Sequence, residues 1–134
     1  MGGDTFRATL TLPSNPIVWT NQDDSSNIVR SQDLVVTWSG GVPGRDFVGV
    51  LGSSADPRIG VGAQFVCTER AGAERFTVPT WVLSALPRIG QSQGVALGFL
   101  SVGSVLEPAR FQASGLDVGI FNWGTLQARN VNYQ

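Results

Sequence analysis

The side chains best suited to chemistry by type and spacing lie between Asn21 and Asn27. The run includes Asp23, Asp24 and two serines, and carboxylate and amide oxygens are the ligands that calcium prefers. It lacks the glycine that makes the sharp turn of a calcium loop and the glutamate that closes the site. We therefore expect a solvated polar loop here, and no metal site.

Histidine and lysine are missing from the whole sequence, and all nine cationic residues are arginines. Their absence removes the commonest general base, the commonest transition-metal ligand and any Schiff-base amine. The serines have no obvious base, and nothing in the sequence brings two of the ten carboxylates together as a glycosidase needs. We predict that the protein is not an enzyme and that it has no catalytic residues and no cofactor.

The single cysteine, Cys67, can form neither an intrachain disulfide nor a zinc site. It alternates with Ala63 and Phe65 on one face of an expected strand. We interpret it as a small buried hydrophobe.

Four tryptophans offer the most functional-looking side chains, because exposed indole rings can stack on sugars and buried ones fill cores. Trp38 falls on the inward face of a strand and Trp81 on a helical turn, so both are expected in the core. Trp19 and Trp123 remain candidates for ligand binding, with core packing as the alternative. Trp123 stands beside Asn122 in a loop-like setting.

One stretch sets the topology of its neighbourhood. Residues 75–78 alternate as a strand does, and Pro79 then interrupts the ladder because it has no N–H to donate. Trp81, Val82 and Leu86 recur at helical spacing before Pro87, which predicts one short helical turn at about residues 80–86. A single turn cannot bury its own apolar side, so it must lie against a sheet.

The rest of the chain reads as short strands between turns rich in glycine and proline. The segment 94–102 is apolar on both faces, which is typical of a covered central strand. Even spacing of short strands predicts an all-β sandwich of two antiparallel sheets. Strands are expected at 5–12, 17–19, 33–38, 47–51, 61–68, 75–78, 94–102, 109–113 and 126–133.

The apolar positions of these strands predict one contiguous core. Its expected members are Phe6, Leu10, Val36, Trp38, Phe65, Cys67, Phe76, Val78, Leu86, Leu97, Phe99 and Phe111.

Length and charge limit the possible classes of protein. A chain of 134 residues suits one domain, so residues 1–134 are predicted to form a single β-sandwich domain. The net charge of −1 and the lack of an arginine run argue against nucleic acid as a partner. No apolar run approaches the roughly 20 residues that a membrane span needs, and no signal peptide stands at the N-terminus. We expect either a cytosolic protein or a mature fragment, and we favour the extracellular side because charged residues are few.

Several phrases together resemble a known family. They are Thr20-Asn-Gln22, Val36-Thr-Trp-Ser-Gly-Gly41, Phe65-Val-Cys-Thr68, Ala71-Gly72 before Phe76-Thr-Val-Pro79, Val82-Leu-Ser-Ala-Leu-Pro87 and Phe111-Gln-Ala-Ser-Gly-Leu-Asp117. The chain is similar, over nearly its whole length, to an uncharacterised module found near the C-termini of large secreted proteins of acidobacterial type. The resemblance implies an immunoglobulin-like β-sandwich, an extracellular or cell-surface location and a place in a longer protein. The cysteine pair of antibody-like domains is missing.

Three function classes follow from these observations. The first is a non-catalytic structural or adhesive module, whose partners are other domains of a larger surface protein or neighbouring copies of itself. The alternative is a carbohydrate-binding module that uses exposed aromatics, with glycans as partners. A hydrolase is the third class, and the missing histidine argues against it.

The ends of the chain raise the question of assembly. Edge strands are usually blunted by lysine, proline or inward charge, and this chain has no lysine. We hypothesise that one terminal segment, 5–12 or 126–133, pairs with a neighbouring subunit in a filament or array. In the alternative, both termini close their own sheet.

Overall fold

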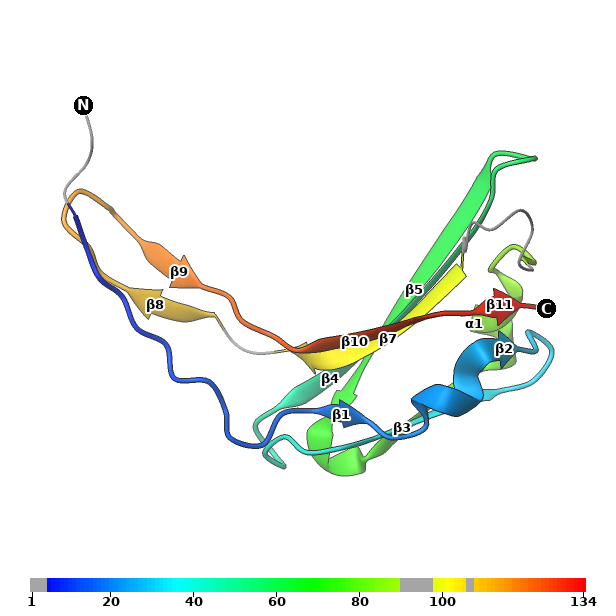
Figure 1. Cartoon of the computed structure of the whole chain (residues 1–134), viewed down its shortest axis with the longest axis horizontal. Helices are drawn as coiled ribbons and strands as arrows, with labels where there is room; N and C mark the ends of the chain where they lie inside the picture. The colour runs from blue at the N-terminus through cyan, green and yellow to red at the C-terminus, as the bar shows by residue number, and fades with distance from the viewer. Residues whose placement is uncertain (1–4, 90–97, 106–107) are drawn as a thin grey trace.

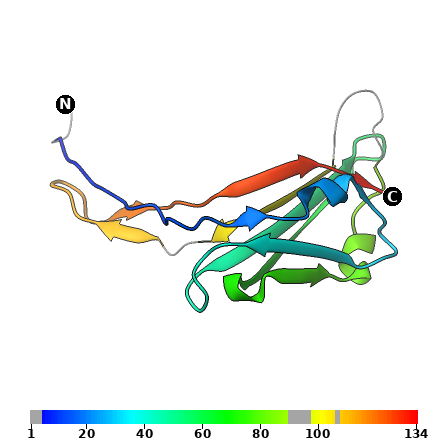
Figure 2. The same cartoon turned by 60° about the horizontal axis from the view of Figure 1, so that its bottom comes forward.

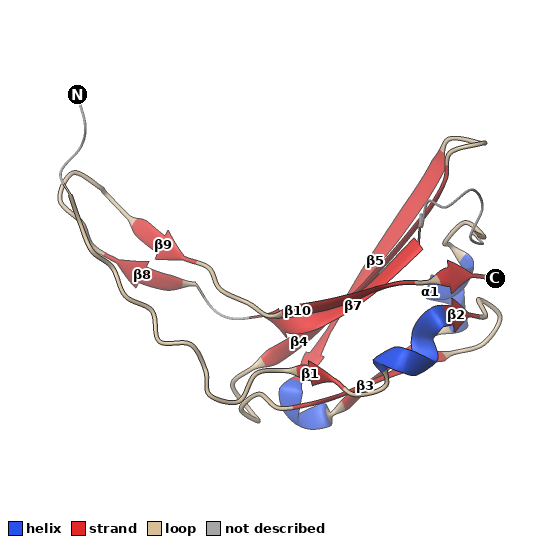
Figure 3. Ribbon diagram, viewed as in Figure 1, coloured by secondary structure: helices blue, strands red, loops and turns tan. Residues whose placement is uncertain are grey.

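The structure is a computed structural model that describes residues 5–89, 98–105 and 108–134. It confirms the predicted all-β sandwich with a short helical turn (Figure 1; Figure 3). The layers are a four-stranded sheet in the order β10-β7-β4-β5 and a three-stranded sheet in the order β1-β3-β6, with small pairs β11-β2 and β8-β9. The strands are β1 (Val18–Trp19), β2 (Asn27–Ile28), β3 (Leu34–Ser39), β4 (Phe47–Asp56), β5 (Val61–Arg70), β6 (Arg75–Val78), β7 (Gly98–Val105), β8 (Ala109–Phe111), β9 (Gly119–Phe121), β10 (Leu126–Asn130) and β11 (Asn132–Tyr133).

The core lies between the two larger sheets. β3 supplies Val36 and Trp38, and β4 supplies Val48 and Val50, all buried by strict alternation along their strands. The Trp38 indole N–H donates to the Ala71 carbonyl at 2.9 Å, so its one polar group is satisfied. Of the other expected core residues, Val78 and Leu86 are buried, and Phe65, Cys67 and Phe76 pack against the core partly buried.

Strand β7 shows that the inward face of this strand was predicted wrongly. Leu100 and Val102 are buried, and Phe99 on the other face is only half-buried. Both faces of the segment are apolar, so alternation could not choose between them. Leu97, also expected in the core, lies outside the described residues.

The helical turn is α1 (Thr80–Ser84), and it follows the extended Pro79. The Thr80 N–H donates to the Asp33 carboxylate at 2.8 Å, which ties the start of the helix to the residue that precedes β3. Leu83 and Leu86 take the buried side at helical spacing, and Trp81 points away with 75% of its surface exposed. The prediction that Trp81 belongs to the core is therefore wrong, because so short a helix buries only one side.

The C-terminal segment closes sheets of its own chain. β10 pairs antiparallel with β7, and β11 pairs parallel with β2. Val131 and Tyr133 are both buried. The pairing therefore does not support the hypothesis that residues 126–133 are donated to a neighbour. It agrees with the alternative, in which this segment pairs within its own chain.

The N-terminal segment behaves differently from the C-terminal one. Residues 5–12 belong to no strand, although their apolar and polar side chains alternate. Phe6 is 55% exposed and lies outside the core, as do the half-buried Leu10 and Phe111. Alternation indicates a strand-like segment, but it does not show that a neighbouring strand is in place to bury it.

Candidate functional site

The feature that stands out from the sandwich is an arm, which we define as residues 5–16 and 108–125. It contains the β8–β9 hairpin and extends away from the two sheets (Figure 2). The N-terminal segment runs beside this hairpin (Figure 1). Pro13 and Pro16 separate the segment from β1, and they cannot donate to a ladder.

Three aromatic rings hold the arm together. The Phe6 and Phe111 rings stack with centroids 5.6 Å apart and planes at 20°, and Phe111 and Phe121 lie 5.1 Å apart at 45°. Gly119 makes this packing possible, because a Cβ there would clash with the Phe111 ring. The aromatic cluster therefore anchors Phe6, near the start of this segment, on the hairpin.

The arm leaves many large apolar side chains in contact with solvent. Besides Phe6, the exposed ones are Leu12, Leu116, Val118 and Ile120. Exposed apolar residues scattered singly are ordinary, but a group on one projecting element marks an interaction surface.

A hollow of about 970 Å³ separates the root of the arm from the sandwich. Leu12 and Pro13 line it from the arm, and Arg45, Asp46 and Phe47 line it from the start of β4. The Asp46 carboxylate accepts from Arg45 Nε at 2.7 Å, and this hydrogen bond holds the pKa of Asp46 below its ordinary value. The hollow is thus lined by apolar side chains, by the Arg45–Asp46 ion pair and by polar residues of the arm, namely Thr11, Ser14 and Asn15.

The second unusual surface is the edge strand β5. Within the described residues it pairs with β4 alone along its ten residues. Phe65 and Cys67 face the core but are only half-buried, and Val66 on the outer face is exposed. Burial raises the pKa of the Cys67 thiol, which keeps it protonated near neutral pH. Cys67 packs against the core as a small hydrophobe, as the sequence predicts, but it is only partly buried.

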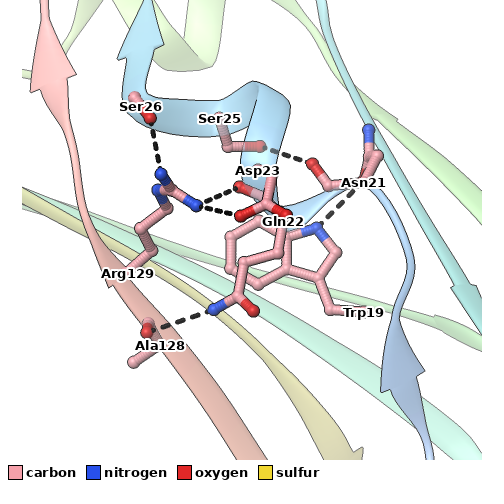
Figure 4. Close-up of polar contacts among 8 residues, drawn as sticks. All are labelled: Trp19, Asn21, Gln22, Asp23, Ser25, Ser26, Ala128 and Arg129. Carbon is pink, nitrogen blue, oxygen red and sulfur yellow. Dashed lines mark hydrogen bonds and ion pairs between the residues drawn. The ribbon is translucent and has the colours of Figure 1, made fainter.

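Trp19, one of the two candidate ligand-binding residues, lies in the core with 4% of its surface exposed. Its indole N–H donates to Asn21 Oδ1 at 3.0 Å (Figure 4). Little of the ring remains for stacking on a sugar. Trp123, the other candidate, is half-buried in the connection between β9 and β10, at the root of the arm.

The run expected as a solvated loop forms the 3-10 helix η1 (Gln22–Ser26), which is tied to β10. Arg129 donates to Asp23 Oδ1 and to Ser26 Oγ, both at 2.8 Å, and to the Gln22 carbonyl at 3.2 Å (Figure 4). Asp23 thus forms an ion pair with the Arg129 guanidinium. The pair is weak because the Asp23 side chain is fully exposed to solvent. Long-range partners of this kind leave no sign in sequence spacing.

Metal-binding clusters and membrane-spanning helices are both absent from the residues that the structure describes. No group of three or more histidine, cysteine, aspartate or glutamate side chains gathers there as a metal would require. No helix in these ranges is long and apolar enough to cross a membrane. Comparison with known proteins found no matching family model, no matching curated protein and no matching solved structure.

The sequence candidates and the structural candidates therefore differ. The sequence carries a signal for the arm and another for the edge of β5, but nothing in it connects the two. Residues 5–12 alternate and are cut off by two prolines, and residues 61–68 contain no charge. What the sequence lacked was the information that neither segment has a full set of neighbours.

Proposed function

We propose that this protein is a non-catalytic structural or adhesive module of an extracellular or cell-surface protein, and that it associates with neighbouring copies through its arm. The observation that carries the proposal is the arm itself, which projects apolar side chains from a sandwich that already has its own core. The extracellular placement rests on the resemblance to the module of secreted proteins.

The energetics of the arm favour association. Each square ångström of apolar surface removed from water is worth about 25 cal/mol. Side chains such as Val118 and Ile120 gain only part of this free energy within one chain, because 61% and 52% of their surfaces stay exposed. A partner that covers them recovers that free energy.

Sedimentation velocity of the whole chain over a wide concentration range tests the proposal. We expect the average mass to rise with protein concentration. Ile120→Ser should weaken association, with the dissociation constant rising about tenfold for each 1.4 kcal/mol of binding free energy lost. Ile59→Ser is the matched control, because Ile59 is an isoleucine at least as exposed as Ile120 and lies in the β4–β5 turn, away from the arm. A chain that stays monomeric at every concentration would refute association.

A second candidate, glycan binding, is favoured by one observation. Trp81 presents an exposed indole on α1, and such rings stack on sugars. A glycan array probed with the whole chain and with Trp81→Ala and Trp123→Ala tests it. Binding that one of these variants abolishes would support a carbohydrate-binding module, and no binding to any glycan would rule against it.

A further inference from the structure

We propose that residues 5–12 of one copy add as a strand along β5 of a second copy. The inference rests on the proposed self-association and names the two surfaces that meet. In this contact, a strand-like segment that has no strand partner within the described residues pairs with an edge strand of another copy of the same protein.

The acceptor has the properties that strand addition needs. β5 is long, and within the described residues β4 is its only neighbour, so one row of its backbone N–H and C=O groups faces outward. From Val61 to Thr68 it carries no charge and no proline, the usual means of blunting an edge. Charged residues appear only at its end, Glu69 and Arg70.

The core side of β5 is also incomplete. Ala63, Phe65 and Cys67 pack against the core, yet each keeps part of its surface exposed. Strands in the middle of a sandwich are covered on both flanks, as β4 shows with Val48 and Val50 buried. One more strand beside β5 would cover these half-exposed side chains.

The donor fits within the length of this acceptor and has a suitable pattern. Residues 5–12 pair with no strand in the described part of the chain, and they are shorter than β5. Phe6, Ala8, Leu10 and Leu12 alternate with polar residues. Placed beside β5, the apolar set continues the core side, and Arg7 joins the outer side near uncharged residues such as Gln64 and Val66.

The geometry favours a second copy over the same chain. Phe6 is stacked on Phe111 in the arm, and the arm extends away from the sandwich that carries β5 (Figure 1). The Phe6–Phe111 stack anchors one end of the segment on the arm, which reduces the entropy lost when the segment pairs. Because the donor and the acceptor are different surfaces, the contact is heterologous and propagates into a filament or closes into a ring.

The single native cysteine supplies the test. A chain carrying Ala8→Cys and Cys67→Ser is mixed with the unsubstituted chain under mild oxidation, so any disulfide between position 8 and Cys67 must join two molecules. A disulfide needs Cα atoms within about 4.4–6.8 Å. Leu10→Cys provides a second position on the apolar face, and Thr9→Cys and Thr11→Cys, in the same Cys67→Ser background, are the controls on the polar face.

We expect linkage to Cys67 from the apolar-face positions at least about tenfold above that from the polar-face positions, because a one-residue shift moves a side chain to the opposite face. Mass spectrometry of the linked peptides identifies the pairs. Equal linkage from both faces, or none, would overturn the β5 pairing. A further control is the Ala8→Cys variant that keeps Cys67. If it forms only an internal disulfide within a monomer, and no disulfide-linked dimers, the pairing between two copies would also be overturned.

A peptide of residues 5–12 gives an independent measurement on the folded, unsubstituted chain. Alkylation of Cys67 by iodoacetamide should slow as the peptide is added, and a peptide with Phe6→Ser and Leu10→Ser should leave the rate unchanged. Sedimentation of the same samples distinguishes self-association in general from the specific pairing with β5. Association without apolar-face linkage defeats the β5 pairing alone, whereas a monomer at all concentrations defeats the proposed function as well.

Discussion

The Tyr133 hydroxyl donates a hydrogen bond to the backbone carbonyl of Phe99 at 3.0 Å, and the tyrosine side chain is fully buried. The bond joins β11 to β7, whereas β11 takes its ladder partner from β2. The C-terminal segment is thus held to two neighbouring structures at once.

Removing this hydroxyl should have a measurable cost. Tyr133→Phe is expected to lower the free energy of unfolding by about 1 kcal/mol, because the Phe99 carbonyl loses its partner in a dry environment. Tyr133→Ala should cost more, about 3–5 kcal/mol, because it also empties the ring's volume. Urea denaturation followed by tryptophan fluorescence measures both, and a Tyr133→Phe variant as stable as the parent would show that the bond contributes nothing.

The same residue provides a titration with a single reporter. Tyr133 is the only tyrosine in the chain, and burial raises its pKa above the ordinary value of 10. The native state therefore keeps the phenolic proton after the unfolded chain has lost it, so stability should be unaffected by this group below about pH 10 and fall above it. Absorbance at 295 nm should show phenolate only as the protein unfolds, and ionisation near pH 10 in the folded state would contradict the burial.

Acid should weaken the turn that holds Asp46. Its pKa is lowered mainly by the hydrogen bond from Arg45, so its stabilising contribution is present above the unfolded value of about 3.9 and is lost as the pH falls through the folded value. Asp46→Ala should be less stable than the parent at pH 7, and the difference should narrow below about pH 4. Thermal melts across this range test it, with the exposed Asp24→Ala as control. A difference that is independent of pH would exclude a role for the charge.

The observed face of β7 predicts unequal effects at adjacent positions. Leu100→Ala should cost about 2–5 kcal/mol, because Leu100 is completely buried. Phe99→Ala should cost less despite removing a larger side chain, because Phe99 is half-buried on the other face. The denaturation midpoints of the two variants test this order. A larger loss of stability for Phe99→Ala than for Leu100→Ala would support the inward face predicted from the sequence.

How much the sequence could predict depended on whether each strand has one polar face. In β3 the alternation of Val36 and Trp38 with Thr37 was unambiguous, and both are buried. In β7 both faces are apolar, so only the packing of the opposite sheet selected Leu100. The short helix was placed well because Pro79 and Pro87 bracket it, but its buried side was set by contacts with other strands.

The candidate surfaces were harder to foresee for a related reason. Phe6 looks like a core residue because its segment alternates, yet its partner is Phe111 on the arm. Trp19 was open to either ligand binding or core packing, and the structure buries its ring while Asn21 satisfies the indole N–H. Exposure depends on partners distant in sequence, which local patterns do not encode.

The parallel pairing of β11 with β2 has a consequence for the order in which the molecule assembles during translation. Asn132 lies opposite Asn27 and Tyr133 opposite Ile28, so β2 must wait for its partner until more than 100 further residues have been made. Until then β2 has no partner and β7 lacks β10 on one side. Contacts this distant in sequence slow folding, and the waiting strands are surfaces on which a chaperone can act before the sandwich closes.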